Sequence, residues 1–260
     1  MRTPRVAQFS LGIGQQLTDE IGFNIDYVNS HGSNLYAQIN ANYVNKAVTP
    51  NVRVLTPKYG DIYLWQSIAK AWNHGILTNI SYLSDEMRAQ LSYTLAWSFS
   101  EQDALSAWTS PSMLAMQRST TDERHRIVFS GTYLLPLGFK VSAVATLASP
   151  MPFGVIDGRD LNKDNATGND WIDGKRNRFK SWNEIRWWYK MFDFRASKVF
   201  DIANAKLEVM FDAFNLFNWF NATGYNGTMN DQNGNQLLSF GTPTGSYAPR
   251  QMQLGLRVIY

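Results

Sequence analysis

RQMQLGLRVIY, residues 250–260, ends the chain in a regular alternation of side chains. Every second position on one side is apolar or aromatic: Met252, Leu254, Leu256, Val258 and Tyr260. The other side carries Gln251, Gln253, Gly255, Arg257 and Ile259. A period of two predicts a β-strand with one apolar face and one mainly polar face. Both a soluble β-sandwich and a membrane barrel contain strands of this kind, so this segment alone leaves the two open.

The same alternation predicts eight further strands, at residues 6–17, 21–29, 72–82, 88–99, 125–135, 139–147, 191–200 and 207–213. Short turns near residues 18, 84, 137 and 202 alternate with long loops at 31–70, 100–123, 150–189 and 217–246. Transmembrane barrels have short turns at one rim and long loops at the other. The pattern therefore predicts an all-β antiparallel meander of about nine transmembrane strands, with short turns at one rim and long loops at the other.

The polar faces of these strands carry charged residues in mid-strand, namely Arg88, Asp193, Arg195, Lys206, Glu208 and Asp212. A wet barrel interior accommodates such residues, and so does the solvated outer face of a sandwich. Aromatic residues fall near the predicted strand ends: Tyr27, Trp97, Phe99, Phe192, Phe200 and Tyr260. Membrane barrels concentrate aromatic rings at these levels, which favours the barrel over the sandwich.

The composition excludes several classes of protein. The net charge of +3 is spread along the chain, so no nucleic-acid partner is expected. Mean hydropathy is −0.30, and no apolar run reaches the roughly 18 residues of a spanning helix. The chain has no cysteine, which excludes disulfide and thiolate chemistry. The first residues, MRTPRVAQFSLGIGQQL, have neither the apolar core nor the cleavage site of a signal peptide.

Several stretches together resemble the barrel of TonB-dependent outer-membrane receptors, of the Oar-like group that has a carboxypeptidase-regulatory-like domain. They are IDYVNSHGSNLY (25–36), QLSYTLAWSFSEQDA (90–104), DERHRIVFSGTYLLPLGFKVS (122–142), FDFRASKVFDIANAKLEVMFDAFNLFNWFN (192–221) and FGTPTGSYAPRQMQLGLRVIY (240–260). The DxRxSKxF strand, the FNLFN segment and the closing PRQMQLGLR strand are specific in this order and spacing. The resemblance covers most of the chain.

The resemblance implies a protein of the outer membrane of a Gram-negative bacterium, with residues 1–260 forming the C-terminal strands of the barrel. Because nine strands are fewer than the about 22 of such barrels, the chain is expected to be an incomplete section of a large outer-membrane β-barrel, with short periplasmic turns and long extracellular loops. The signal peptide and the plug domain are likewise expected to be missing from this chain. The implied partners are outer-membrane lipid and lipopolysaccharide, the outer-membrane barrel assembly machinery, and the TonB complex, reached only through the missing plug. Leu254, Leu256, Val258 and Tyr260 resemble the C-terminal signal that the assembly machinery reads.

The expected function is uptake of a large nutrient such as a metal chelate, an oligosaccharide or a peptide. The alternative is a surface adhesin or carbohydrate-binding β-protein without transport activity, built as a smaller barrel or a soluble sandwich. No catalytic motif occurs, and His31, His74 and His125 are scattered without metal-ligand spacing. No enzyme activity and no cofactor are therefore expected.

Two groups of loop residues are candidates for binding. Aromatic rings in or beside the long loops could stack on a ligand, and the candidates are Trp108, Trp182, Trp187, Trp188, Trp219 and Tyr225. The loop 155–179 is rich in oxygen donors, of which Asp160, Asn162, Asp164 and Asp170 form a possible Ca²⁺ site. The EF-hand pattern fails at Asn165 and Trp171, so capping of backbone turns is the competing interpretation.

Overall fold

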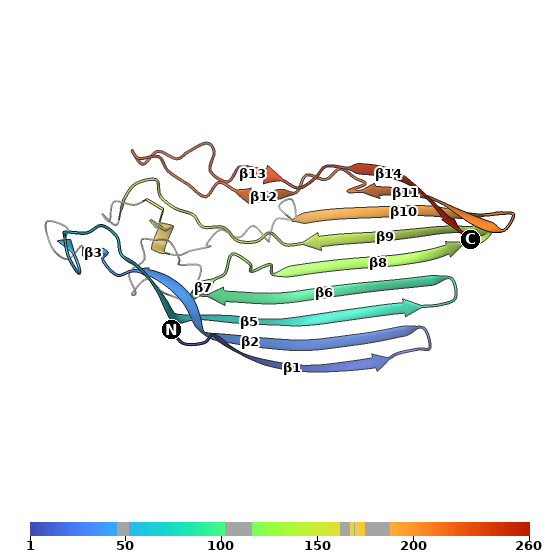
Figure 1. Cartoon of the computed structure of the whole chain (residues 1–260), viewed down its shortest axis with the longest axis horizontal. Coiled ribbons are helices and arrows are strands. Elements are labelled where there is room, and N and C mark those ends of the chain that lie inside the picture. The colour runs from blue at the N-terminus through green and yellow to red at the C-terminus, as the bar shows by residue number, and fades with distance from the viewer. Residues whose placement is uncertain (46–51, 102–115, 162–166, 169, 175–187) are drawn as a thin grey trace.

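The computed structural model describes residues 1–45, 52–101, 116–161, 167–168, 170–174 and 188–260. Nine long strands form one antiparallel sheet in chain order (Figure 1). They are β1 (Arg5–Gln16), β2 (Ile21–Asn40), β5 (Tyr63–Leu83), β6 (Met87–Ser100), β8 (His125–Leu135), β9 (Phe139–Ala148), β10 (Tyr189–Ile202), β11 (Ala205–Phe214) and β14 (Gln251–Ile259). A short strand, β7 (Gln117–Arg118), pairs with the end of β6. The predicted antiparallel meander of nine strands is confirmed.

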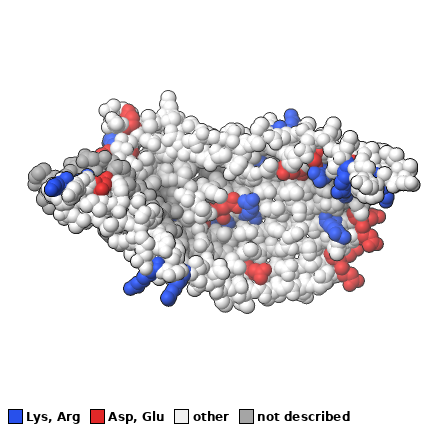
Figure 2. Space-filling model, in the orientation of Figure 1, with Lys and Arg blue, Asp and Glu red and all other residues white. Residues whose placement is uncertain are grey.

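The two ends of the sheet differ as the loop lengths predict. The chain turns tightly between β1 and β2, β5 and β6, β8 and β9, and β10 and β11, all at the end that carries the C-terminus (Figure 1). The long connections and the N-terminus lie at the opposite end. Figure 2 shows acidic side chains gathered at the tips of the β1–β2 and β5–β6 hairpins, where the sequence has Asp19, Glu20, Asp85 and Glu86. We call the two ends the short-turn rim and the long-loop rim.

The short turns follow from local side-chain chemistry. Thr18 Oγ1 accepts hydrogen bonds from the backbone N–H groups of Glu20 and Ile21, at 3.2 and 3.0 Å. Ser84 Oγ accepts one from Met87 N–H at 3.1 Å in the equivalent turn. Hydroxyl groups at the first position of a turn stabilise it in this way.

Strand pairing gives the sheet one apolar face. Ile80, Leu91, Phe129, Ala145 and Phe192 are joined as direct partners across five strands. This face is largely uncovered, and Leu254 and Leu256 are 80% and 72% exposed. The other described sheets have only two strands each: β3 (Val44–Asn45) pairs with β4 (Val52–Arg53), and β12 (Ala222–Tyr225) pairs with β13 (Pro243–Ser246). In the described part of the chain, therefore, no second layer makes a sandwich. A single layer with an uncovered apolar face is the arrangement of a barrel wall in lipid.

Two strands are longer than predicted. The sequence analysis ended the second strand at residue 29 and began the third at residue 72, whereas β2 continues to Asn40 and β5 begins at Tyr63. The alternation is hidden because the β2–β5 register shifts around Gly32 and Leu35, where Asn34 has a φ of 55°. A bulge of this kind moves the following side chains to the other face.

The interior of the molecule sits beyond the bulge, at the long-loop rim. Ala37, Ile39 and Ala69 are buried there. The Asn42 amide donates hydrogen bonds to the backbone oxygens of Thr56, Tyr59 and Gly60, and so holds the following loop together. This β2–β5 loop also contains β3 and β4, and the other long loops contain η4 (Ile172–Gly174), β12 and β13. Among the described residues, no helix has the length and apolarity needed to cross a membrane.

Candidate functional site

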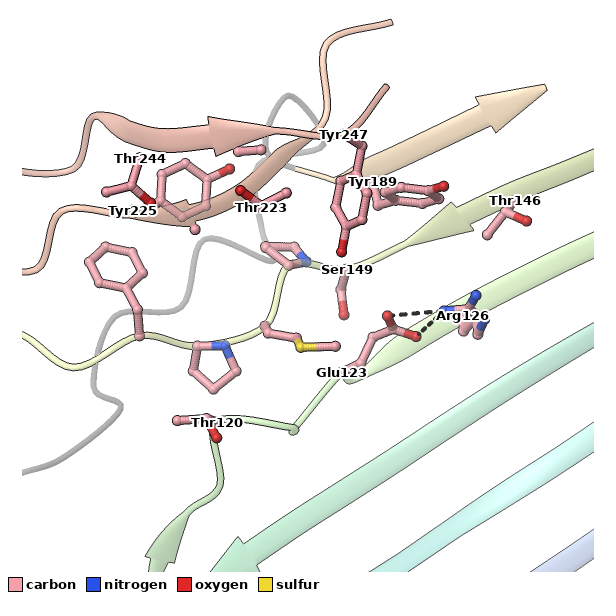
Figure 3. A pocket seen from close by; sticks show the side chains of 16 residues that line it. Thr120, Glu123, Arg126, Thr146, Ser149, Tyr189, Thr223, Tyr225, Thr244 and Tyr247 are labelled. Carbon is pink, nitrogen blue, oxygen red and sulfur yellow. Dashed lines mark hydrogen bonds and ion pairs between the residues drawn. The ribbon is translucent and has the colours of Figure 1, made fainter. Parts of the chain in front are cut away.

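A hollow of about 560 Å³ opens at the long-loop rim, and we call it the rim cleft. It is lined by the outer ends of β8, β9 and β10, by the segment that follows β9, and by the β12–β13 hairpin (Figure 3). Arg126 and Thr146 place it on the polar face, because they lie one residue out of step with the apolar row of Ile127 and Leu147. Its volume falls within the roughly 300–1,000 Å³ of small-molecule sites.

Four aromatic side chains from three parts of the chain line the rim cleft: Phe153, Tyr189, Tyr225 and Tyr247. The rings of Phe153 and Tyr225 are stacked, with centroids 5.5 Å apart and planes inclined by 29°. Tyr189 and Tyr247 meet edge to face, with centroids 5.4 Å apart. Rings fixed by mutual packing bind a ligand without losing much side-chain freedom, and their hydroxyl groups add hydrogen bonds.

The polar groups of the cleft are mainly hydroxyl groups, with one ion pair. Arg126 Nη1 donates to both oxygens of Glu123, at 2.9 and 3.1 Å (Figure 3). Thr120, Thr223 and Thr244 supply hydroxyl groups from three different segments. The lining thus combines apolar ring surface with donors and acceptors, the mixture that orients ligands in protein sites.

Asn221 fixes the β12–β13 hairpin against the sheet. Its side chain is buried and makes two hydrogen bonds to the backbone of Lys190: Oδ1 accepts from N–H at 2.7 Å, and Nδ2 donates to the carbonyl at 2.8 Å. Asn221 O also accepts from Tyr247 N–H at 2.9 Å. Asn221 therefore anchors both Tyr189, which is the chain neighbour of Lys190, and Tyr247, whose own backbone N–H it accepts.

A second contact joins two long loops beside the cleft. Asp157 is buried and accepts hydrogen bonds from Nε and Nη2 of Arg159, each at 2.9 Å, and from Asn230 Nδ2 at 2.7 Å. Backbone bonds run alongside it, since Met229 N–H donates to Ile156 O at 2.9 Å. We call this group the loop clasp. Hydrogen bonds from Arg159 hold the pKa of the Asp157 carboxyl well below its ordinary value, although burial opposes this effect.

The polar face below the cleft carries ion pairs that cross the strands. Arg195 on β10 pairs with Asp212 on β11, and Gln253 on β14 donates to the same carboxylate at 2.9 Å. Glu208 on β11 bonds both Arg257 and Lys140, the latter with 3.5 Å between Nζ and Oε1. The charged residues predicted for the polar face, Arg195, Glu208 and Asp212, are thus confirmed to share it. Paired charges of this kind fit a wet barrel interior.

The residues predicted to bind a ligand through their aromatic rings do not all lie at the rim cleft. Tyr225 lies in the rim cleft, whereas Trp219 packs on Phe217 with centroids 4.8 Å apart and does not line the cleft. Trp188 stacks on His125 with centroids 5.9 Å apart and does not line the cleft either. Trp108, Trp182 and Trp187 lie outside the described residues. The prediction for these aromatics as a group stays untested, and of the three candidates that the structure describes, Tyr225 alone lines the cleft.

Sequence reasoning missed Phe153 and Tyr247 as cleft residues. Phe153 lies a few residues after the predicted strand 139–147, and Tyr247 a few residues before the terminal strand. Both therefore sit just beyond a strand end at the long-loop rim. An aromatic residue at this distance from a strand end is the signal that could have identified them.

The predicted Ca²⁺ ligands cannot be assembled from the described residues. Asn162 and Asp164 lie outside them, while Asp160 and Asp170 are described. Within the described ranges, no group of three or more His, Cys, Asp or Glu residues could hold a metal ion. The first carboxylate of this loop, Asp157, is engaged in the loop clasp. The calcium site remains a prediction.

The C-terminal residues that resemble an assembly signal lie along an uncovered strand. Leu254, Leu256 and Val258 share the apolar face with Phe211, Val209 and Leu207 of β11. Tyr260 follows the last residue of β14 and is fully exposed. This placement leaves the four side chains accessible, and their role in assembly remains a prediction.

Comparison with known proteins identifies the family and the fold of this chain. Residues 1–187 match the family described as outer membrane beta barrel domain. No curated protein matches the chain. Among solved structures, the chain is similar to the outer membrane transporter YddB from Escherichia coli, with 12% identity and a TM-score of 0.58 over 99% of this chain and 33% of that one.

Two further solved structures are also similar in fold to this chain. The ferripyoverdine receptor of the outer membrane of Pseudomonas aeruginosa has 16% identity and a TM-score of 0.58, over 98% of this chain and 27% of that one. The FrpB iron transporter from Neisseria meningitidis has 13% identity and a TM-score of 0.51, over 98% and 31%. The chain thus spans about a third or less of the length of these structures. The resemblance to TonB-dependent receptor barrels is confirmed at the level of fold, and the chain belongs to the outer membrane beta barrel domain family.

Proposed function

We propose that this chain supplies barrel wall and outer loops to a TonB-dependent outer-membrane receptor, and that the rim cleft binds the nutrient. The observation that carries the proposal is the position of the cleft. It lies on the polar face of a membrane sheet, at the rim with the long loops. A ligand that arrives from outside would meet it before entering the barrel interior.

The extent of the receptor is part of the same proposal. In the described sheet, β1 and β14 each pair on one side only. Unpaired strand edges are unfavourable within a membrane, because their N–H and C=O groups lack water. We infer that residues 1–260 form a partial barrel, completed by strands outside this sequence, and that a plug domain provides the contact with the TonB complex. The assembly machinery would recognise Leu254, Leu256, Val258 and Tyr260 at the β14 edge.

The rim cleft is tested by removing its rings. We expect the double variant Tyr225→Ala/Tyr247→Ala to weaken ligand binding at least tenfold, because well-packed aromatic residues in a binding site usually contribute more than about 1 kcal/mol each. Binding of ferric chelates, oligosaccharides and peptides to the chain in detergent would be measured by calorimetry.

The matched control is Tyr59→Ala, which removes a ring that is 60% exposed on another outer loop. Binding unchanged in the double variant, or weakened equally by Tyr59→Ala, would contradict the assignment of the cleft. The ligand that binds would identify the nutrient class.

We also expect no uptake by cells that express only these 260 residues. A nine-stranded open sheet does not enclose a lumen, and energy-coupled entry requires the plug. The measurement is accumulation of the labelled nutrient identified in the binding experiment, with cells carrying an empty vector as the control. Accumulation above the empty-vector level would disprove the proposal that the chain is only part of the transporter.

A further inference from the structure

A second hollow, of about 500 Å³, lies beside the rim cleft on the polar face, and we call it the wall hollow. Thr94 on β6 lines the wall hollow and is the direct strand partner of Arg126 on β8, which lines the rim cleft. Direct partners in a sheet project their side chains to the same face. Thr120 lines the rim cleft, and its chain neighbour Thr121 lines the wall hollow. The two hollows therefore adjoin across the β6–β8 pair.

A row of amide and hydroxyl groups crosses the wall hollow. Ser30, Asn73 and Ser98 are direct partners on β2, β5 and β6. Ser98 Oγ donates to Asn73 Oδ1 at 2.6 Å, and Asn73 Nδ2 donates to Ser30 Oγ at 3.5 Å. Thr121 Oγ1 continues the row, 3.5 Å from Ser98 Oγ. Hydroxyl and amide groups both donate and accept hydrogen bonds, so the row offers a ligand both kinds of partner.

The floor of the wall hollow consists of small and apolar side chains. Val28, Gly75 and Ala96 form the next row of strand partners, and Leu77 is the partner of Thr94 in the row after it. Leu77 is 39% exposed although it lies on the polar face. The wall hollow thus combines apolar surface with hydrogen-bonding groups, as ligand sites in proteins do.

The acidic and basic residues of the two hollows are already paired. Among the described residues that line them, Glu123 and Arg126 are the only Asp, Glu, Lys or Arg residues, and they are bonded to each other. An anionic chelate, or the charged ends of a short peptide, would leave water here without gaining an ionic partner, which costs free energy. The lining therefore favours a neutral ligand that is rich in hydroxyl groups.

We propose that the rim cleft and the wall hollow together bind a neutral oligosaccharide. This inference rests on the proposed function of the rim cleft, to which it adds the substrate class and a second subsite. In the rim cleft, the C–H face of a sugar ring stacks on Tyr225 or Tyr247, because the negative face of an aromatic ring attracts such hydrogens (Figure 3). In the wall hollow, further sugar rings cover Leu77 and form hydrogen bonds with Asn73 and Ser98.

The span of the two hollows sets the length of the ligand. Tyr189 on β10 lines the rim cleft and Asn73 on β5 lines the wall hollow, with four strand spacings between these strands. At about 4.8 Å each, the spacings amount to about 19 Å. A linear hexasaccharide is long enough to occupy both hollows, whereas a disaccharide fits within the rim cleft. The longer chain should therefore bind more tightly.

The test compares two double variants that each remove an asparagine and a serine from β5 and β6. Asn73→Ala/Ser98→Ala changes the wall hollow. Asn79→Ala/Ser92→Ala is the matched control, because Asn79 Nδ2 donates to Ser92 Oγ at 2.9 Å and neither residue is among the described lining of the two hollows. The chain in detergent would be titrated by calorimetry with neutral disaccharides and hexasaccharides of glucose, mannose, galactose and xylose, with ferric citrate and with a tetrapeptide.

We expect at least one hexasaccharide to bind the wild type more tightly than the disaccharide of the same sugar. Asn73→Ala/Ser98→Ala should weaken binding of that hexasaccharide roughly tenfold, because two neutral hydrogen-bonding groups are lost. The control variant should weaken it less than twofold. Binding of the disaccharide in the rim cleft should change less than twofold in both variants, which also shows that both are folded.

The contrary outcomes separate this inference from the proposed function. Hexasaccharide binding that is unchanged in Asn73→Ala/Ser98→Ala, or weakened equally by the control, would overturn the second subsite. Binding of ferric citrate or the tetrapeptide without any oligosaccharide would overturn the substrate class, and its loss in Tyr225→Ala/Tyr247→Ala would leave the rim cleft as the nutrient site. Oligosaccharide binding that Tyr225→Ala/Tyr247→Ala does not weaken would contradict the proposed function as well, and so would the absence of binding by every probe.

Discussion

Leu91→Arg is expected to destabilise the membrane-inserted sheet by about 2–4 kcal/mol, the cost of an arginine on the lipid face near the bilayer midplane. Leu91 lies in the middle of the apolar face, between Ile80 on β5 and Phe129 on β8, and is 42% exposed. In lipid, its side chain would touch acyl chains. A guanidinium at this position would have to leave water without gaining a partner.

The adjacent substitution Gln90→Arg is the matched control. Gln90 is on the same strand but the opposite face, between Ser81 and Ser130, where a charge remains in a polar environment. We expect it to cost less than about 1 kcal/mol. Urea unfolding of both variants in lipid vesicles, followed by far-UV circular dichroism, would measure the difference. Equal costs would mean that the apolar face does not contact lipid, and the membrane assignment would be wrong.

Asp157→Asn is expected to release the loop clasp. The buried carboxylate bonds Arg159 and reaches Asn230 in another loop, so neutralising it removes the charged acceptor from three side-chain hydrogen bonds and from one donated by the Arg159 backbone N–H. Losing the partner of a buried polar group costs about 1–3 kcal/mol. Hydrogen exchange at the amides of Ile156 and Met229, which join the two loops, should accelerate roughly 5- to 150-fold.

The lowered pKa of Asp157 sets the pH dependence of this contact. A carboxyl whose pKa is lower in the folded state stabilises fully above its ordinary value of 3.8 and loses the contribution as pH falls below it. Because the folded protein takes up this proton only at its lowered pKa, the Met229 amide resonance of the wild type should stay constant through pH 3.8 and shift only well below it, while that of Asp157→Asn should not shift.

Asp231→Asn is the control for the clasp, because Asp231 accepts hydrogen bonds from Asn233 and Asn235 within its own turn. It should leave exchange at Ile156 unchanged. If Asp157→Asn and Asp231→Asn had the same effect, the two loops would not be held together by Asp157.

The strands were predictable because their signal is local. Side chains two positions apart share a face, so Leu91 and Tyr93, or Leu254 and Leu256, reveal a strand without any distant partner. The same rule failed at Asn34, because a positive φ and a register shift break the alternation in β2. The prediction therefore ended that strand before Leu35 and assigned Ala37 and Ile39, which are buried, to a loop.

The sites were less predictable because their members are far apart in the chain. Tyr225 was a candidate by type and position, but its stacking partner Phe153 is 72 residues away, and Asp157 meets Asn230 across 73 residues. The histidines were interpreted as scattered, whereas the strand register places them in three successive rows of one face. A sequence pattern within one segment cannot show which residues of distant segments come into contact.

The sequence by itself determined the nine alternating strands, their apolar and polar faces, and the sorting of short turns and long loops to opposite rims. Those properties depend on neighbouring residues and on connection length, both of which can be read directly. Tertiary structure alone decided the register. Register placed Tyr189 beside Tyr247 and His74 beside Trp97, because cross-strand contacts depend on how strands align and not on what each one contains.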